Sequence, residues 1–380
     1  MESPIGASLS AGFGDQLAKL DRQGRRRRLM LASGHDFASN DYLALASSAE
    51  LKVAIVDALS RGIPIGAGAS RLLRGNHPEH ELLEEEAARF FGSERALFFS
   101  SGFAANSALL ATLPQRGDII IHDELVHASS REGIRLARAP AFAARHNDSG
   151  DVADQLREWR LKGGRGRPWI VVESLYSMDG DIAPLDDLLR LTDQFDGFLI
   201  IDEAHATGLF GPGGRGLAAG MDGAENVITV RTCGKALGCE GALVCCTSTI
   251  RDFLINRGRP FIFSTAPSPL MAAAVRAALN LLDGDPGRRQ KLEDLAAFAA
   301  HRLQPLGATC HGTQILPLIL GEDEPTMAIA QRLQEQGFDV RGIRPPTVPE
   351  HSSRLRISIS LNVDRQAIAG LSAALSEALA

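Results

Sequence analysis

Short, fully apolar segments recur along the first two thirds of the chain and limit the possible folds more than any other feature. Each is four to six residues long, and stretches with helical spacing of apolar residues separate them. Continuous apolar strands are typical of sheets buried on both faces, so the pattern predicts an α/β fold with a largely parallel sheet between helices. The expected strands are residues 96–99, 118–122, 169–173, 198–202, 227–231 and 241–246.

The pattern changes after residue 265, where two long helical stretches lead into isolated strands. We therefore predict an N-terminal arm (1–45), a large domain (46–265) and a smaller C-terminal α+β domain (266–380). A chain of 380 residues with 44% hydrophobic and 23% charged residues can bury the cores that this requires. The expected helices are residues 16–20, 80–91, 103–113, 269–282, 288–303, 327–336 and 365–379, and the small domain's strands are 315–320 and 355–360.

Charge and hydropathy argue against two classes of partner. The formal net charge of -6 gives no reason to expect nucleic acid or an anionic membrane surface. No apolar run approaches the roughly 20 residues that cross a bilayer, and Met1–Gly14 lacks the basic start and apolar core of a signal peptide. We therefore expect a soluble, cytoplasmic protein.

Two further features are read from composition. The five cysteines are an odd number without metal-ligand spacing, which fits free thiols in a reducing compartment, and we predict no metal site. The run Arg25-Arg26-Arg27-Arg28 is basic in an otherwise acidic chain. Such a run is commonly a solvated helix end; the alternative is an anion site for a carboxylate or a coenzyme A phosphate.

The candidate chemistry follows two of the apolar runs. Asp202 ends the run 198–202 and His205 lies three residues on, while Lys235 follows the run 227–231 between Gly234 and Gly238. An acid at a strand end, a nearby His and a later Lys among glycines are the parts of a pyridoxal phosphate (PLP) site. There the Lys amine forms a Schiff base with the cofactor and the acid pairs with the ring nitrogen.

Each of these residues has an ordinary structural interpretation as well. A free Lys has a pKa near 10.4 and is almost entirely protonated at pH 7, so an exposed surface Lys is the alternative for Lys235. Glycines let backbone and cofactor approach closely, which favours the site. Asp202 at the end of an apolar strand needs a partner, and a pyridinium N–H supplies one. His205 alone would be a satisfied core His, and beside Asp202 and Lys235 we expect it at the ring oxygen.

Phosphate and ring contacts are expected from other strand ends. Gly102 and Phe103 open a helix and offer backbone N–H groups to a phosphate. Thr232 offers a hydroxyl, and His127 is a candidate to stack on the ring face. Because ligands of parallel sheets bind at the carboxyl ends of the strands, these groups can meet there. Glu173 also ends a strand.

Over nearly its full length the chain resembles the α-oxoamine synthases, which are fold-type-I PLP enzymes. The resemblance implies a mostly parallel, seven-stranded sheet and a homodimer with shared active sites. The Pro-rich segment 344–349 is similar to that of the biotin-synthesis branch. The matching segments are Ser39–Leu43, Gly66–Leu72, Ser101–Asn106, Tyr176–Asp181, Asp202–Gly208 and Gly234-Lys235.

The resemblance also assigns roles around the cofactor. Lys235, His205, Asp202 and His127 are the expected catalytic residues: Lys235 carries PLP, Asp202 pairs with its ring nitrogen, and His127 stacks on the ring. The remaining expected cofactor contacts are Ser177 at the ring oxygen, Gly102 and Phe103 through their backbones, Thr232 at the phosphate, and Thr265 at the phosphate of the neighbouring subunit.

Substrate contacts come from the two ends of the chain. Arg356 matches the carboxylate-binding Arg of the family, and Thr347 and Asn40 match substrate positions. An N-terminal Arg contacts substrate in this branch; Arg25 is our choice, with Arg22, Arg26 and Arg27 as alternatives. The chain departs from the family pattern at Ala44 and Ala206, where Gly is usual.

The expected reaction is a decarboxylative condensation of L-alanine with a pimeloyl thioester, carried by coenzyme A or a carrier protein. Alternatives within the family are glycine C-acetyltransferase (2-amino-3-ketobutyrate ligase), 5-aminolevulinate synthase and serine palmitoyltransferase. A non-catalytic PLP-binding protein is a further class, and the presence of both Lys235 and Asp202 argues against it. A nucleotide-dependent oxidoreductase is prompted by Gly66-Ala67-Gly68, but that loop follows Pro64 rather than a clean strand.

Overall fold

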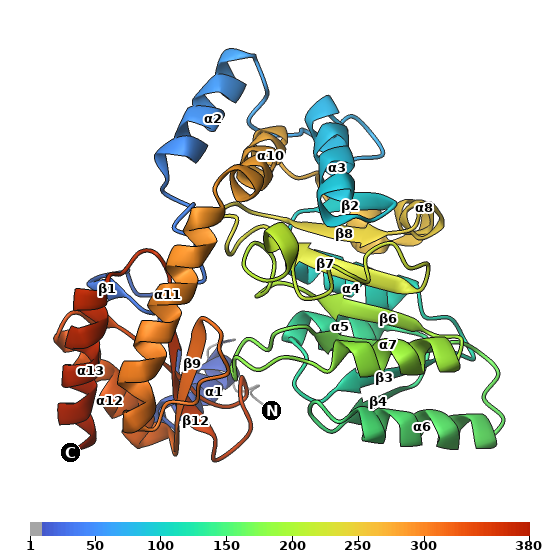
Figure 1. Ribbon diagram of the computed structural model, residues 1–380. Helices are drawn as coiled ribbons and strands as arrows, with labels where there is room; N and C mark the ends of the chain where they lie inside the picture. The colour runs from blue at the N-terminus through green and yellow to red at the C-terminus, as the bar shows by residue number, and fades with distance from the viewer. Residues whose placement is uncertain (1–9) are drawn as a thin grey trace, which may run out of the picture. The chain divides into compact units, whose positions relative to one another are not determined.

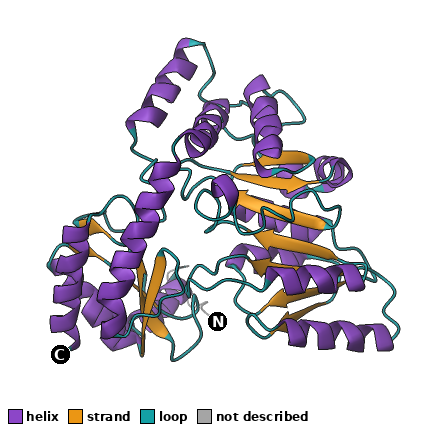
Figure 2. Ribbon diagram, in the orientation of Figure 1, coloured by secondary structure: helices purple, strands orange, loops and turns teal. Residues whose placement is uncertain are grey.

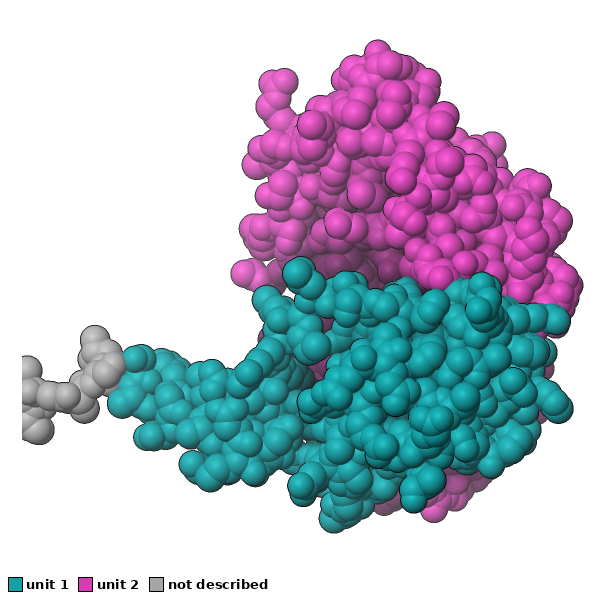
Figure 3. All heavy atoms as spheres, turned by 90° about the vertical axis from the view of Figure 1, so that its left-hand side faces the viewer, with its two compact units in different colours: residues 1–39, 295–359, 363–380 teal, residues 40–294, 360–362 magenta. Residues whose placement is uncertain are grey.

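The computed structural model describes residues 10–380, and its internal contacts divide the chain into two compact units (Figure 3). The large unit comprises residues 40–294 and 360–362, and the small unit comprises residues 1–39, 295–359 and 363–380. The first nine residues of the expected arm, and with them most of the segment Met1–Gly14, lie outside the described range. In the part that is described, no helix is long and apolar enough to cross a membrane.

A seven-stranded sheet forms the centre of the large unit (Figure 1). Its order is β2-β8-β7-β6-β5-β3-β4. The strands from β7 to β4 run parallel, whereas β8 is antiparallel to both β2 and β7. The mostly parallel sheet expected from the apolar runs is thereby confirmed. The bounds are β2 Arg95–Phe99, β3 Ile119–Asp123, β4 Ala141–Ala144, β5 Pro168–Glu173, β6 Phe198–Asp202, β7 Val227–Thr232 and β8 Ala242–Cys246.

Strand β4 is the member of this sheet that is absent from the expected strands. It is four residues long, has the sequence Ala-Phe-Ala-Ala, and lies at the edge of the sheet beside β3. Phe142 is 53% exposed. The segment is apolar, but three of its four residues are alanines, which have a low strand propensity, so its sequence carries little strand signal.

Helices cover both faces of the sheet (Figure 2). Alternate residues of each strand point to opposite faces, so each face packs against its own set of helices. On one face, Trp169, Val171, Ile200 and Val230 pack against helices α4, α5, α8 and α9. On the other, residues of the intervening positions pack against α6 and α7. The bounds are α4 Gly102–Thr112, α5 Ala128–Leu136, α6 Ser149–Leu161, α7 Leu185–Gln194, α8 Ser248–Arg257 and α9 Arg259–Ile262.

The rest of the large unit is helical. Helix α10 (Pro269–Gly284) packs on α2 (Ala49–Ser60) and α3 (Pro78–Phe91), and α11 (Pro286–Leu303) follows it. Before α2, Ala44 has a φ of +53°, in the left-handed region that favours glycine. The left-handed backbone explains why Gly is usual at this position, where this chain has Ala.

The small unit holds its own antiparallel sheet, in the order β11-β12-β9, and a parallel pair of β1 and β10. Helix α13 buries Ile368, Leu371 and Leu375 of the predicted apolar stripe, whereas Leu379 is 38% exposed. The bounds are β1 His35–Asp36, β9 Ile315–Gly321, β10 Phe338–Asp339, β11 Arg341–Ile343, β12 Ser353–Ser358, α1 Ala11–Arg22, α12 Asp323–Glu335 and α13 Arg365–Leu379.

Candidate active site

The carboxyl ends of β5, β6 and β7 bring three predicted or suspected site residues to one edge of the sheet. Glu173 and Asp202 are paired in register across β5 and β6, and Thr232 ends β7. Counting by twos along each strand places all three on the sheet face that α4 and α5 cover. Residues of those helices can therefore reach them.

Asp202 is a buried carboxylate with two donors. The residue is 7% exposed. Asn106 Nδ2, from the second turn of α4, donates to Oδ2 at 2.7 Å, and the backbone N–H of Ala204 donates to Oδ1 at 3.0 Å. Hydrogen bonds to the ionised form favour it. Asp202 is thus prepared to accept a further charged N–H donor.

A chain of hydrogen bonds connects Asp202 to His127. Asn106 Nδ2 also donates to Ser129 Oγ at 3.0 Å, and Ser129 Oγ lies 2.8 Å from His127 Nδ1. The backbone N–H of Ser129 donates to the same Nδ1 at 3.2 Å. His127 Nδ1 is therefore an acceptor, and the ring proton belongs on Nε2. Burial lowers the pKa of His127, so the ring is neutral.

Lys235 lies at the other end of this group of residues. Its Nζ donates to Thr232 Oγ1 at 3.3 Å. Thr232 in turn touches the start of α4 so closely that a Cβ on Gly102 would lie 2.7 Å from Thr232 Cγ2. Only Gly lets the helix N-terminus approach this hydroxyl. The first N–H groups of α4 have no helical partner, and half-exposed Phe103 follows Gly102.

His205 is joined to the segment before α2. Its Nδ1 lies 2.6 Å from the hydroxyl of Tyr42, which donates to Asn40 Oδ1 at 3.1 Å. Because Tyr42 gives its proton to Asn40, its oxygen accepts from Nδ1–H of His205. His205 and Tyr42 are both buried. Two predicted site residues, His205 and Asn40, are thus linked through one phenol.

Glu173 stands beside this group as a second buried acid. Its Oε2 accepts the backbone N–H of Ser177 at 3.3 Å. Burial and the neighbouring charge of Asp202 together raise the pKa of Glu173 to about 8, while Lys235 opposes the shift. Ser177, the residue expected at the ring oxygen, is therefore tied to the end of β5.

The charges of Lys235 and Asp202 act on the same neighbours. The negative charge of Asp202 raises the pKa of His127 and the pKa of Glu173, and the positive charge of Lys235 lowers both. These groups fit PLP, whose phosphate and ring nitrogen lie at opposite ends. The Lys235 amine, the Thr232 hydroxyl and the N-terminus of α4 suit the aldehyde and the phosphate, and the Asp202 carboxylate suits the ring nitrogen. Among the buried polar atoms of the described chain that have no protein partner are three from this region, Asn106 Oδ1, Glu173 Oε1 and Thr207 Oγ1.

The substrate positions predicted on the small unit form a cluster of their own. Arg25 Nε donates to Asp323 Oδ2 at 2.6 Å, and its Nη2 donates to Glu350 Oε2 at 2.7 Å. Arg27, one of the alternatives, reaches Thr347 Oγ1 at 3.3 Å through Nη2. Two of the basic residues thus bind groups of the loop that contains the Pro-rich segment. The run is not a simple solvated helix end.

The remaining predicted residues are placed as follows. Arg356, in the centre of β12, is 5% exposed and donates from Nη1 to Ser358 Oγ at 2.7 Å. Thr265 is exposed and follows α9 in the large unit. An exposed position suits a residue that was expected to serve a neighbouring subunit.

Asn106, Ser129 and Tyr42 are site residues for which sequence reasoning predicted no role. Asn106 and Tyr42 lie within the segments that match the family, which is the signal that could have drawn attention to them. Ser129 has no comparable signal. An Asn amide and a Ser hydroxyl acquire a function only when α4 and α5 bring them to the end of β6.

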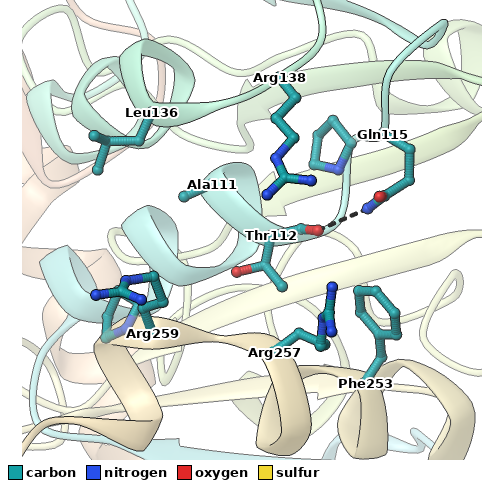
Figure 4. Close-up of a pocket in the computed structure, with 10 residues that line it drawn as sticks. Ala111, Thr112, Gln115, Leu136, Arg138, Phe253, Arg257 and Arg259 are labelled. Carbon is teal, nitrogen blue, oxygen red and sulfur yellow. Dashed lines mark hydrogen bonds between the residues drawn. The ribbon is translucent and has the colours of Figure 1, made fainter.

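A separate surface pocket lies at the opposite end of α4 (Figure 4). It has a volume of about 340 Å³ and is lined by Thr112, Gln115, Arg138, Arg257 and Arg259 among others. Its three arginines are exposed, and the carbonyl oxygen of Thr112 at the helix C-terminus accepts from Gln115 Nε2 at 2.8 Å. None of the predicted site residues lines it, so it is not the cofactor site.

Comparison with known proteins agrees with the fold and the site. The family model of aminotransferase class I and II matches residues 33–375, and the chain therefore belongs to this family. An 8-amino-7-oxononanoate synthase of Geobacter sulfurreducens is 42% identical over 368 residues, which cover 96% of this chain and 91% of the relative. The expected resemblance to the α-oxoamine synthases is confirmed.

Two solved structures show the same architecture. An 8-amino-7-oxononanoate synthase from Francisella tularensis is 30% identical with a TM-score of 0.77, covering 91% of this chain and 97% of the other. A serine palmitoyltransferase with bound PLP is 25% identical with a TM-score of 0.87, covering 98% of each chain. The expectation of a fold-type-I PLP transferase is thereby confirmed.

Proposed function

We propose that this chain catalyses the PLP-dependent condensation of L-alanine with a pimeloyl thioester, which yields 8-amino-7-oxononanoate, CO₂ and the free thiol. The reaction is a step of biotin biosynthesis. The observation that carries the proposal is the 42% identity to an 8-amino-7-oxononanoate synthase over 96% of the chain. The geometry around Lys235 and Asp202 supports it, since both charges act on His127 and Glu173.

The residues that would hold PLP are those at the strand ends. Lys235 would bind the aldehyde, Thr232 and the N-terminus of α4 would bind the phosphate, and Asp202 would pair with the ring nitrogen. When bound, PLP withdraws electrons from the Cα of the amino acid that it carries. Asp202, which accepts two hydrogen bonds from the protein, would hold the protonated ring nitrogen that this withdrawal requires.

Proton transfer falls to Lys235. Its amine donates to Thr232 Oγ1, and when not bound to PLP it would serve as the base that takes the Cα proton of the substrate and as the acid that returns it. The electron withdrawal supplied by PLP would let Cα form a C–C bond to the thioester carbonyl with loss of the thiol. The proton returned by Lys235 would replace the CO₂ that leaves Cα.

The two histidines orient and stabilise. Neutral His127 presents its ring while Ser129 and Asn106 hold its Nδ1 side. His205 is held by Tyr42 at Nδ1, and the family resemblance assigns it to the ring-oxygen side of the cofactor.

Carboxylate recognition is assigned to Arg356, Arg25, Thr347 and Asn40, as the family resemblance implies. Arg356 is buried and suits the amino-acid carboxylate, because burial strengthens an Arg–carboxylate pair. Arg25 would exchange Asp323 and Glu350 for the distal carboxylate of the pimeloyl group. The working form is a homodimer in which Thr265 reaches the cofactor phosphate of the neighbouring subunit.

The test is a substrate panel that separates this proposal from the other branches of the family. Purified protein with PLP is incubated with alanine, glycine or serine, each against pimeloyl, acetyl, succinyl and palmitoyl thioesters. The expected result is thiol release with alanine and a pimeloyl thioester, at a kcat/KM at least tenfold above every other pair. Preference for serine with palmitoyl thioester would instead favour the activity that the 25% identical neighbour's name states.

A further inference from the structure

Two buried acids lie side by side at the cofactor site. Glu173 and Asp202 are paired residues of parallel strands, so their side chains point to the same face. Glu173 is 3% exposed and Asp202 is 7% exposed. The charge of Asp202 raises the pKa of Glu173, so ionising both acids in this buried site carries a penalty.

The hydrogen bonds decide which of the two is charged. Asp202 accepts a side-chain N–H at 2.7 Å and a backbone N–H at 3.0 Å, one on each oxygen. Glu173 accepts the N–H of Ser177 at 3.3 Å on Oε2, and within the described residues its buried Oε1 has no partner. A carboxylate with an unsatisfied buried oxygen is the costlier ion, so the proton belongs to Glu173.

The charged and titratable groups that face Glu173 agree with this assignment. Burial and the charge of Asp202 raise the pKa of Glu173 to about 8 against the opposing effects of Lys235 and of the backbone N–H groups of Ser177 and His127. Tyr176, in the loop after β5, has a pKa raised by its own burial and by the acids Asp123 and Glu173.

We propose that Glu173 is a positioning residue of the cofactor site that keeps its proton at neutral pH. Its carboxyl group ties the backbone of Ser177 to the end of β5, and its neutrality leaves the charge of the paired acids on Asp202. The role toward the cofactor rests on the proposed function, whereas the proton on Glu173 is a property of the protein alone.

The experiment compares the wild type with Glu173→Gln, which keeps the size and the neutral charge, and Glu173→Ala, which leaves a gap. Urea unfolding of the apo-proteins is measured between pH 6 and 8. Above pH 4.5 an unfolded Glu is ionised, whereas folded Glu173 keeps its proton to about pH 8. Raising the pH therefore destabilises the wild type relative to Glu173→Gln, and the ratio of their unfolding constants should rise nearly tenfold per pH unit.

The second measurement is PLP binding at pH 7, followed by the visible absorbance of the bound cofactor. Glu173→Gln should retain the wild-type spectrum and affinity within about threefold, and Glu173→Ala should bind PLP at least tenfold more weakly. The proposal is overturned by a ratio of unfolding constants that does not change with pH, or by Glu173→Gln losing PLP as severely as Glu173→Ala. A wild type that fails to bind PLP would refute the proposed function and leave the unfolding result to decide the proton.

Discussion

Replacing Arg231 by Met should unfold this protein more readily than almost any other single change, because it breaks a buried ion network behind the cofactor site. Arg231 is fully buried at the end of β7. Its Nη1 donates to Glu203 Oε2 at 3.1 Å, its Nη2 donates to Asp222 Oδ2 at 2.5 Å, and its Nε donates to Thr229 Oγ1 at 3.2 Å. Glu203 is the residue directly after Asp202.

The magnitude follows from what the substitution leaves behind. Met fills most of the volume, but Glu203 and Asp222 lose their shared cation inside the protein. Breaking a buried pair from one side costs about 3–5 kcal/mol. With a urea dependence of about 3 kcal/mol per molar, the unfolding midpoint should fall by about 1–1.7 M. A matched control is Arg257→Met, since exposed Arg257 has no ion pair among the described residues; its midpoint should move by less than about 0.2 M.

The pH dependence of the loss provides an internal check. Burial raises the pKa of Glu203 and the pKa of Asp222, and Arg231 opposes both shifts. Without Arg231 both pKa values rise further, so the folded variant binds more protons than the folded wild type and loses stability as the pH rises. The deficit should be larger at pH 8 than at pH 5.5. A midpoint that matches Arg257→Met, or a deficit that grows toward acid pH, would refute this account of the network.

Three further changes have defined outcomes. Ala44→Gly should stabilise the protein by about 0.5–1 kcal/mol. It removes the strain of about 1–2 kcal/mol that a left-handed backbone imposes on Ala, and this exceeds the destabilisation that Gly causes by making the unfolded chain more flexible. An unchanged or lower urea midpoint would contradict this. Burial lowers the pKa of His146, but hydrogen bonds to two carboxylates outweigh this effect and raise that pKa to about 10. The loss of stability in His146→Gln should therefore be largest at pH 6 and should shrink as the pH approaches 10. Urea unfolding at these two pH values measures the difference. Arg25→Ala should raise the KM for the pimeloyl thioester about 10- to 100-fold with a smaller change in kcat, and equal effects in Arg27→Ala and Arg25→Ala would argue against Arg25 as the specific contact.

The sequence was sufficient for the sheet wherever burial dictates composition. Strands β5 and β6 are covered by helices on both faces, and each is a nearly continuous apolar run that ends in an acid. Edge strand β4 was missed because it is short and rich in alanine, which has a low strand propensity. The residues at the carboxyl ends of the strands could be identified for the same reason, since parallel strands converge their ends at one edge.

The polar network around the site could not be predicted, because it depends on side chains from separate elements meeting at hydrogen-bond distance. Asn106 joins Asp202 to Ser129 only because α4 lies over β6 and beside α5. The protonation of Glu173 likewise depends on its register with Asp202. The sequence pattern predicts which face of an element a residue occupies, whereas these roles require atoms to be placed to within a few tenths of an ångström.

The most direct test of the cofactor assignment is to locate the covalent bond between protein and PLP. The chain has five lysines, at positions 19, 52, 162, 235 and 291. The purified protein is saturated with PLP, reduced with borohydride, digested, and its peptides are identified by mass spectrometry. We predict one reduced PLP adduct per chain, on Lys235. An adduct on another lysine in preference to Lys235, or none at all, would contradict the claim that Lys235 and Asp202 hold the two ends of one cofactor.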